Sequence, residues 1–152
     1  MDEKYMKMAL KEAEKAQKED EVPIGAVIVL DGKVVARAHN QMEKRQSATA
    51  HAEMIAIEKA CKKLKSWRLL DAEMYVTVEP CSMCAGAIAN ARIKKVYFGA
   101  FEPKSGGAVS KYPILSDNGL NHSVESEGGI MLTPCEQIIK NYFKAKRVKS
   151  LD

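Results

Sequence analysis

The sequence EMYVTVEPCSMCAG at residues 73–86 changes character at Pro80. Residues 73–78 are mostly β-branched or aromatic and predict a strand, which Pro80 ends. The small residues that follow predict a helix over 81–91, and residues 95–99 again have the composition of a strand. A strand, a helix and a strand joined by short connections predict two parallel strands with a right-handed crossover.

The segments on either side extend this pattern. Asp31-Gly32 lies between two apolar runs, which is a strong signal for a β-hairpin. Residues 39–48 and 101–122 lack clear periodicity and are predicted to be irregular. Alternating elements of this kind predict a layered α/β fold. Helices are predicted over 2–20, 49–64, 81–91 and from 133 onward, and strands over 25–30, 33–38, 73–78, 95–99 and 123–127.

Two helix starts carry capping signals. Thr49 is a fair N-cap for the second predicted helix. The last helix opens with Thr133-Pro134-Cys135-Glu136, which predicts Thr133 at the N-cap, proline at the first helical position and glutamate completing a capping box.

Length and composition limit the class of protein. The chain has 152 residues, of which 46% are hydrophobic and 29% charged, close to the averages of globular proteins. We therefore expect one domain over residues 1–152. No apolar run approaches the roughly 20 residues that cross a bilayer, so no membrane association is expected. The charged start Met1-Asp2-Glu3-Lys4 does not resemble a secretory signal, and we expect a cytoplasmic protein.

The net charge of +4 is concentrated at the end of the chain. Residues 140–152 contain five lysine or arginine residues and one acidic residue, a surplus of four that leaves residues 1–139 neutral. A basic segment on a neutral body is typical of binding to a polyanion. The alternative is a solvated helix end, where cations are also favoured by the helix dipole.

Three side chains have the spacing of a metal site. Cys81 and Cys84 lie three residues apart at a predicted helix start, so they share one face. His51 lies near the start of the preceding helix. If the two helix N-termini meet on one sheet, an imidazole and two thiolates converge. Three such ligands with an open fourth position are typical of catalytic Zn²⁺.

Glu53 lies two residues after His51. It is too close along the helix to complete the same tetrahedron comfortably, but it can reach a water molecule in the fourth position. We therefore predict that Glu53 shuttles protons. The other interpretation of Cys81 and Cys84, a redox pair, is less favoured because the aromatic-Cys-Gly-Pro pattern of thioredoxin-like proteins is absent.

The chain resembles the bacterial tRNA-specific adenosine deaminases of the cytidine/deoxycytidylate deaminase superfamily. The histidine–glutamate pair followed by Pro-Cys-x-x-Cys is the zinc deaminase signature, and the similarity covers nearly the whole chain. The matching segments are Glu21-Val-Pro-Ile-Gly-Ala-Val, Ala38-His-Asn40, Thr49-Ala-His-Ala-Glu53, Trp67-Arg-Leu-Leu, Tyr75-Val-Thr-Val-Glu-Pro-Cys-Ser-Met-Cys-Ala-Gly86 and Asn121-His122.

This resemblance implies a fold and an activity. The fold is a cytidine-deaminase-like three-layer α-β-α sandwich, with a five-stranded mixed sheet and helices on both faces. The activity is hydrolytic deamination of adenosine to inosine at wobble position 34 of a tRNA anticodon, usually tRNA-Arg, by a homodimer with one Zn²⁺ per subunit. Because the bases of an anticodon loop are unpaired, little free energy is needed to move the target base out of its stack.

The resemblance also implies roles for individual residues. His51, Cys81 and Cys84 would bind zinc, and Glu53 would be the proton donor and acceptor. Contacts to the purine, the anticodon loop or the tRNA backbone would come from Asn40, Glu102, Lys104, Asn121, His122, Phe143 and Arg147. The ending Tyr142-Phe-Lys-Ala-Lys-Arg147 is similar to the last helix that tracks the tRNA backbone, and it is also the basic segment.

Three segments depart from the family pattern. Glu102 stands where aspartate is common, Ser123 stands where arginine is common, and residues 107–113 replace the usual Gly-Ser-Leu segment. All three lie in regions expected to touch RNA rather than metal. They leave two alternatives open: a deaminase of a free purine base or nucleoside, such as a guanine deaminase, and a zinc-stabilised RNA-binding subunit without catalysis.

Overall fold

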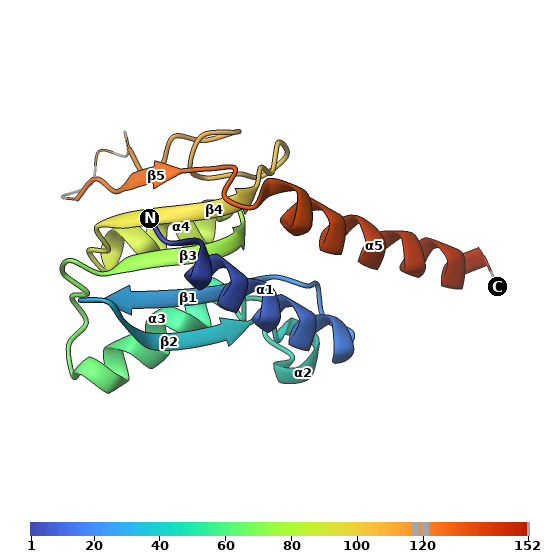
Figure 1. Ribbon diagram of the computed structural model, residues 1–152, viewed down its shortest axis with the longest axis horizontal. Coiled ribbons are helices and arrows are strands. Elements are labelled where there is room, and N and C mark those ends of the chain that lie inside the picture. The colour runs from blue at the N-terminus through green and yellow to red at the C-terminus, as the bar shows by residue number, and fades with distance from the viewer. Residues whose placement is uncertain (117–118, 120–121, 152) are drawn as a thin grey trace.

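The computed structural model describes residues 1–116, 119 and 122–151. Within them, five strands form one sheet in the order β2-β1-β3-β4-β5 (Figure 1). The elements are α1 (Glu3–Lys18), β1 (Gly25–Leu30), β2 (Lys33–His39), α2 (Met42–Arg45), α3 (Ala52–Leu64), β3 (Glu73–Val78), α4 (Ser82–Asn90), β4 (Lys95–Ala100), β5 (Glu125–Glu127) and α5 (Leu132–Leu151).

The sheet is mixed, as predicted. Strand β1 pairs antiparallel with both β2 and β3, whereas β3, β4 and β5 run parallel. The parallel pair β3–β4 is joined through α4, which confirms the strand–helix–strand unit expected from residues 73–99. Because β1 is antiparallel to both of its neighbours, β2 and β3 point the same way, and their carboxyl ends lie at one edge of the sheet.

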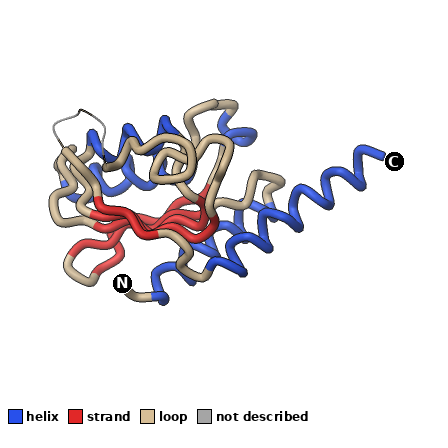
Figure 2. The backbone as a smooth tube through the Cα atoms, turned by 90° about the horizontal axis from the view of Figure 1, so that it is seen from above, coloured by secondary structure: helices blue, strands red, loops and turns tan. Residues whose placement is uncertain are grey.

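Side chains that alternate along the strands build a core on each face of the sheet. On one face Ile28, Met74 and Val76 pack with α3 and α4. On the other face Val27 and Tyr75 pack with α1 and the start of α5. Figure 2 shows the sheet between the two sets of helices. The expected three-layer arrangement with helices on both faces is therefore confirmed.

The start of α3 differs from the sequence-based prediction. The helix begins at Ala52, and its N-cap is His51 rather than Thr49. The Thr49 hydroxyl lies 3.2 Å from that of Ser47, and the Thr49 carbonyl accepts a hydrogen bond from the His51 amide. The Ala52 amide instead donates to Asn40 Oδ1 at 2.7 Å. A residue twelve positions earlier supplies the acceptor, so local sequence did not indicate it.

Two further predictions are wrong. Residues 42–45 form the short helix α2, because the buried Glu21 carboxylate accepts hydrogen bonds from the amides of Glu43 and Lys44. Helix α5 begins at Leu132, so Thr133 lies inside its first turn and is not its N-cap. Among the described helices, none is both long and apolar enough to cross a membrane.

The close approach of α1 to β1 depends on Gly25. A Cβ at this position would overlap the Ala9 carbonyl oxygen and lie 2.7 Å from the Ala13 backbone nitrogen. We expect Gly25→Ala to lower the free energy of unfolding by about 1–3 kcal/mol, because α1 must shift. The matched control is Gly86→Ala in α4, where a Cβ meets nothing within 4 Å.

The control substitution should raise stability by about 0.5–1 kcal/mol, because alanine is the better helix former. Urea denaturation of the two variants measures both values. Equal stability of Gly25→Ala and the unmodified chain would contradict the packing described for α1.

Candidate active site

Two helix starts bring the predicted metal ligands together. His51 is the N-cap of α3, Cys81 is the N-cap of α4, and Cys84 lies in the first turn of α4. Their ligand atoms all lie within 4.8 Å of one another, and in the described part of the chain no other group of three or more such residues could hold a metal. His51 Nδ1 is 3.6 Å from Cys81 Sγ and 3.5 Å from Cys84 Sγ. We call these three residues the metal cluster.

Connections at the same sheet edge hold the two helix starts in place. Asn40, directly after β2, binds the first amide of α3 and so fixes the backbone next to His51. After β3, the Pro80 carbonyl accepts a hydrogen bond from the Gly107 amide at 2.7 Å, and Cys81 forms an isolated antiparallel bridge with Gly106. Each side of the cluster is thus supported by a hydrogen bond to the backbone from a residue distant in sequence.

The electrostatics of the cluster favour a divalent cation. Hydrogen bonds from Cys84 and His51 lower the pKa of Cys81 to about 4. The same hydrogen bond to Cys81, together with burial, raises the pKa of Cys84. The hydrogen bond with Cys81 raises the pKa of His51. Without a metal, Cys81 is therefore the thiolate, and it accepts hydrogen bonds from Cys84 and His51. A Zn²⁺ ion would take the place of these protons and bind both thiolates and the imidazole.

Glu53 lies beside the cluster and is almost fully enclosed. Its side chain is 4% exposed, and burial raises its pKa to about 7. Among the described residues, Glu53 Oε1 is the one buried side-chain oxygen or nitrogen that lacks a hydrogen-bond partner. A buried polar atom without a hydrogen-bond partner lowers the stability of a protein interior. This orphaned oxygen fits a site that is completed by a metal and its bound water or substrate.

Three of the expected substrate-contact residues, Asn40, Glu102 and Lys104, come shortly after β2 and β4. Asn40 is 3% exposed, and its carbonyl oxygen is used by the Ala52 amide. Glu102 is half-buried, and its carboxylate accepts a hydrogen bond from the backbone amide of Lys104, whose own side chain is exposed. These residues sit on the segments that flank the two helix starts.

The other expected contact residues are more widely placed. His122 Nε2 lies 2.8 Å from the Ile93 carbonyl oxygen, so this ring fixes a loop to the turn before β4. Phe143 is 42% exposed and Arg147 is also exposed, both on α5, which extends beyond the sheet (Figure 1). Asn121 lies outside the described residues.

Sequence reasoning missed Glu79. This residue directly precedes Pro80, is 3% exposed, and receives hydrogen bonds from the segment 102–110. Burial opposes its ionisation, yet the hydrogen bonds from the Ser110 hydroxyl and from backbone amides hold the pKa of Glu79 below its ordinary value. The only available signal was a lone carboxylate at the end of an otherwise apolar strand.

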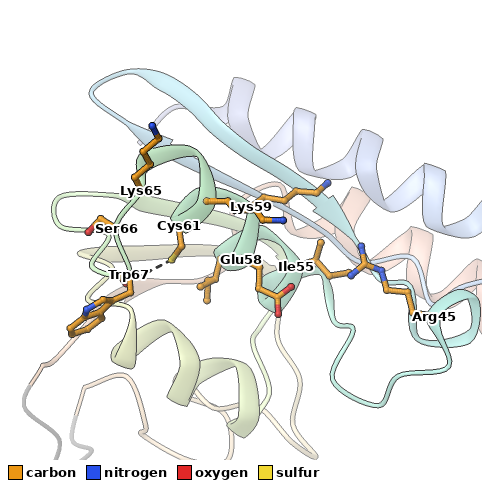
Figure 3. Close-up of a pocket in the computed structure, with 10 residues that line it drawn as sticks. Arg45, Ile55, Glu58, Lys59, Cys61, Lys65, Ser66 and Trp67 are labelled. Carbon is orange, nitrogen blue, oxygen red and sulfur yellow. Dashed lines mark hydrogen bonds between the residues drawn. The ribbon is translucent and has the colours of Figure 1, made fainter.

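A large surface cavity lies away from the cluster. It has a volume of about 800 Å³ and follows the outer side of α3, as Figure 3 shows. Its lining includes Ile55, Cys61 and Trp67, and the Cys61 thiol points to the Trp67 carbonyl oxygen at 3.8 Å. None of the metal-cluster residues lines it. The cavity and the cluster are therefore separate features of the surface.

Comparison with known proteins identifies the family of this chain. The family model described as MafB19-like deaminase matches residues 1–147. The tRNA-specific adenosine deaminase of Bacillus subtilis (strain 168) is 48% identical over 148 residues, which cover 97% of this chain and 92% of that protein. The chain belongs to the tRNA-specific adenosine deaminase family. It is accordingly a deaminase, with the cluster and Glu53 at the positions of the signature.

Two solved structures extend this comparison. A structure from a study of A-to-I editing by tRNA:A34 deaminases at the wobble position is 44% identical, with a TM-score of 0.86, and covers 89% of this chain and 98% of its own. Guanine deaminase from Bacillus subtilis is 41% identical, with a TM-score of 0.63, and covers 66% of each chain. The fold of this family is thus confirmed.

The pKa values of the cysteines lead to a labelling prediction for the metal-free protein. At about pH 6, Cys81 should react with iodoacetamide, because its thiolate form already predominates. Burial raises the pKa of Cys61, which should react only at higher pH and serves as the internal control. Added Zn²⁺ should protect Cys81 but leave Cys61 unchanged.

Peptide mass spectrometry across a pH series measures both reactions. The same pH dependence for Cys81 and Cys61, or labelling of Cys81 that is indifferent to Zn²⁺, would contradict the described electrostatics.

Proposed function

We propose that this protein hydrolytically deaminates adenosine to inosine at wobble position 34 of a tRNA anticodon, with one Zn²⁺ held by His51, Cys81 and Cys84. The observation that carries the chemistry is the buried, unpartnered carboxylate oxygen of Glu53 beside this cluster. The tRNA substrate is supported by relatives named for it that match nearly the whole chain.

The proposed reaction consumes water and releases ammonia. When bound, Zn²⁺ supplies the Lewis acidity that lowers the pKa of a water molecule toward neutrality. Glu53 would accept one proton from the attacking water and deliver it to N1 of adenine, where it remains in inosine. It would then pass the proton of the new C6 hydroxyl group to the amino group, which leaves as ammonia. Its burial suits this task, because burial raises the pKa of the Glu53 carboxyl group and so favours uptake as well as release of a proton.

The proposed RNA contacts surround this centre. Asn40 would face the purine, and the side chains Glu102, Lys104, Asn121 and His122 would lie near the anticodon loop. On α5, Phe143 and Arg147 would contact the tRNA backbone. We propose tRNA-Arg as the substrate, a single deaminase domain over residues 1–152, a homodimer as the working unit, and the cytoplasm as its location.

Contacts between Asp20 and the second half of α5 support a fixed direction for this helix. Lys146 forms a 2.7 Å ion pair with Asp20, and the Tyr142 hydroxyl donates to the Asp20 carbonyl oxygen at 3.4 Å. These contacts tie one side of α5 to the end of α1. The opposite side leaves Lys144 and Arg147 exposed, as binding to phosphates requires.

Deamination of a free purine is the second candidate. The 41% identity to a guanine deaminase favours it, and that protein shares the fold. The basic, exposed end of α5 has no obvious use in such an enzyme. A non-catalytic RNA-binding subunit is the least supported hypothesis, because a buried carboxylate oxygen without a hydrogen-bond partner serves no structural purpose.

The direct test compares substrates. The zinc-loaded protein is incubated with a tRNA-Arg anticodon stem-loop containing adenosine 34 and, separately, with adenine, adenosine, guanine, guanosine and cytidine. Mass spectrometry should detect inosine in the stem-loop alone. Turnover of a free purine with an unchanged stem-loop would overturn the proposal in favour of the second candidate.

Substitution of Glu53 tests its role in proton transfer. Glu53→Gln should retain zinc and the fold but lower kcat by about 100-fold or more, because the amide cannot accept the proton. The control is Glu58→Gln, which alters an exposed carboxylate on the same helix and should leave kcat unchanged. Near-normal turnover by Glu53→Gln would refute the proposed mechanism.

The charge on α5 should appear in the salt dependence of binding. The double variant Lys144→Gln/Arg147→Gln removes two exposed cations, and the slope of log Kd against log salt should fall by about 1–2. The control Lys7→Gln/Lys11→Gln removes two exposed cations from α1 and should have little effect. Fluorescence anisotropy with the stem-loop measures the slope, and equal slopes for both variants would remove the role assigned to α5.

A further inference from the structure

Glu79 occupies an unusual position for a fully enclosed carboxylate. It directly follows β3 and lies two residues before Cys81 of the metal cluster. The described residues show no ion pair between Glu79 and a lysine, arginine or histidine. Every hydrogen bond that the structure shows for its carboxylate goes to one segment, residues 102–110, which lies far along the chain. We call residues 102–112 the rim loop.

Both carboxylate oxygens are saturated by donors of the rim loop. Oε1 accepts from the Glu102 amide at 3.0 Å and from the Ser110 hydroxyl, and Oε2 accepts from the amides of Ala108, Val109 and Ser110 at 3.2, 2.8 and 2.9 Å. Several donors converging on one ionised acceptor make strong, short hydrogen bonds. These hydrogen bonds join one carboxylate to both Glu102 and residues 108–110 of a loop without regular secondary structure.

The backbone of the rim loop also contacts the segment that carries the two cysteines. The Gly107 amide donates to the Pro80 carbonyl oxygen, and Gly106 forms the bridge to Cys81. A Cβ at Gly107 would lie 2.9 Å from the carbonyl oxygen of Cys81 and 2.9 Å from Ala85 Cβ, so the two backbones touch. The amides of Lys111 and Tyr112 in turn donate to the Gly106 carbonyl.

The exposed side chains of the rim loop have the chemistry to bind single-stranded RNA. Tyr112 is 44% exposed and Val109 is 59% exposed, and the Lys104 and Lys111 side chains are also exposed. An exposed aromatic ring in a loop that also carries exposed lysines is the chemistry that stacks an unpaired base and neutralises phosphates.

We propose that Glu79 is a positioning residue that fixes the rim loop against Pro80 and Cys81, and thereby holds Tyr112 and its neighbouring lysines where they contact the nucleotides flanking the target adenosine. This inference rests on the proposed function. Glu79 acts through the rim loop rather than on the reacting atoms, so its loss should weaken substrate binding more than the chemical step.

The test is steady-state kinetics of Glu79→Gln on the adenosine-34 stem-loop. The amide keeps the size of the side chain, but its NH₂ group must face donors of the rim loop. We expect KM to rise about tenfold or more while kcat stays within about threefold and zinc content is unchanged. The matched control is Ser110→Ala, which removes one donor and retains the carboxylate, and its KM should change by less than about threefold.

A second measurement does not depend on RNA. Amide hydrogen exchange of the zinc-loaded protein should show faster exchange of the Ala108, Val109 and Ser110 amides in Glu79→Gln than in Ser110→Ala. Faster exchange in a protein that leaves the stem-loop unchanged would uphold the anchoring and refute the proposed function. Should Glu79→Gln fail to fold, Glu79→Asp, which retains the charge, should give an intermediate KM and intermediate exchange rates.

Three results would overturn the proposal. An unchanged KM would show that the rim loop does not position the substrate. A loss of zinc in proportion to the loss of activity would make Glu79 a support of the metal cluster instead. Unchanged exchange of the rim-loop amides would show that the carboxylate does not determine the conformation of the loop.

Discussion

The parallel direction of β2 and β3 is the constraint on which the site depends. Both strands flank β1 in antiparallel register, so their carboxyl ends lie at the same edge of the sheet. From this edge the chain continues into α3, after the short helix α2, and into α4, and the N-caps of α3 and α4 are His51 and Cys81. The cluster is thus assembled by strand order, from residues thirty positions apart in the sequence. Helix N-termini also stabilise the thiolates that a metal requires.

Local patterns were sufficient to predict this framework. The apolar runs, Asp31-Gly32 and the small-residue helix after Pro80 predict the strands, the hairpin and the crossover that the structure contains. The spacing of Cys81 and Cys84 likewise predicts that both lie on one face of their helix, and the structure brings His51 to that face. These features follow from interactions within a few residues, which is the range at which periodicity and capping signals operate.

The features that sequence reasoning missed share a different origin. Asn40 replaces Thr49 as the acceptor at the start of α3, Glu21 organises α2, and Glu79 organises residues 102–110. Each is a buried polar side chain that satisfies backbone amides distant in sequence. Their partners are determined only when the sheet has formed, so a polar residue at a strand end gives no local indication of what it will bind.

We infer that a metal bound by one imidazole and two thiolates lies next to Glu53. X-ray absorption spectroscopy at the zinc edge of the purified protein tests it most directly. We expect one zinc per chain, with two sulfur ligands at about 2.3 Å and the remaining nitrogen or oxygen ligands at about 2.0–2.1 Å. A first shell without sulfur, a shell of four sulfurs, or metal far below one equivalent would contradict this account.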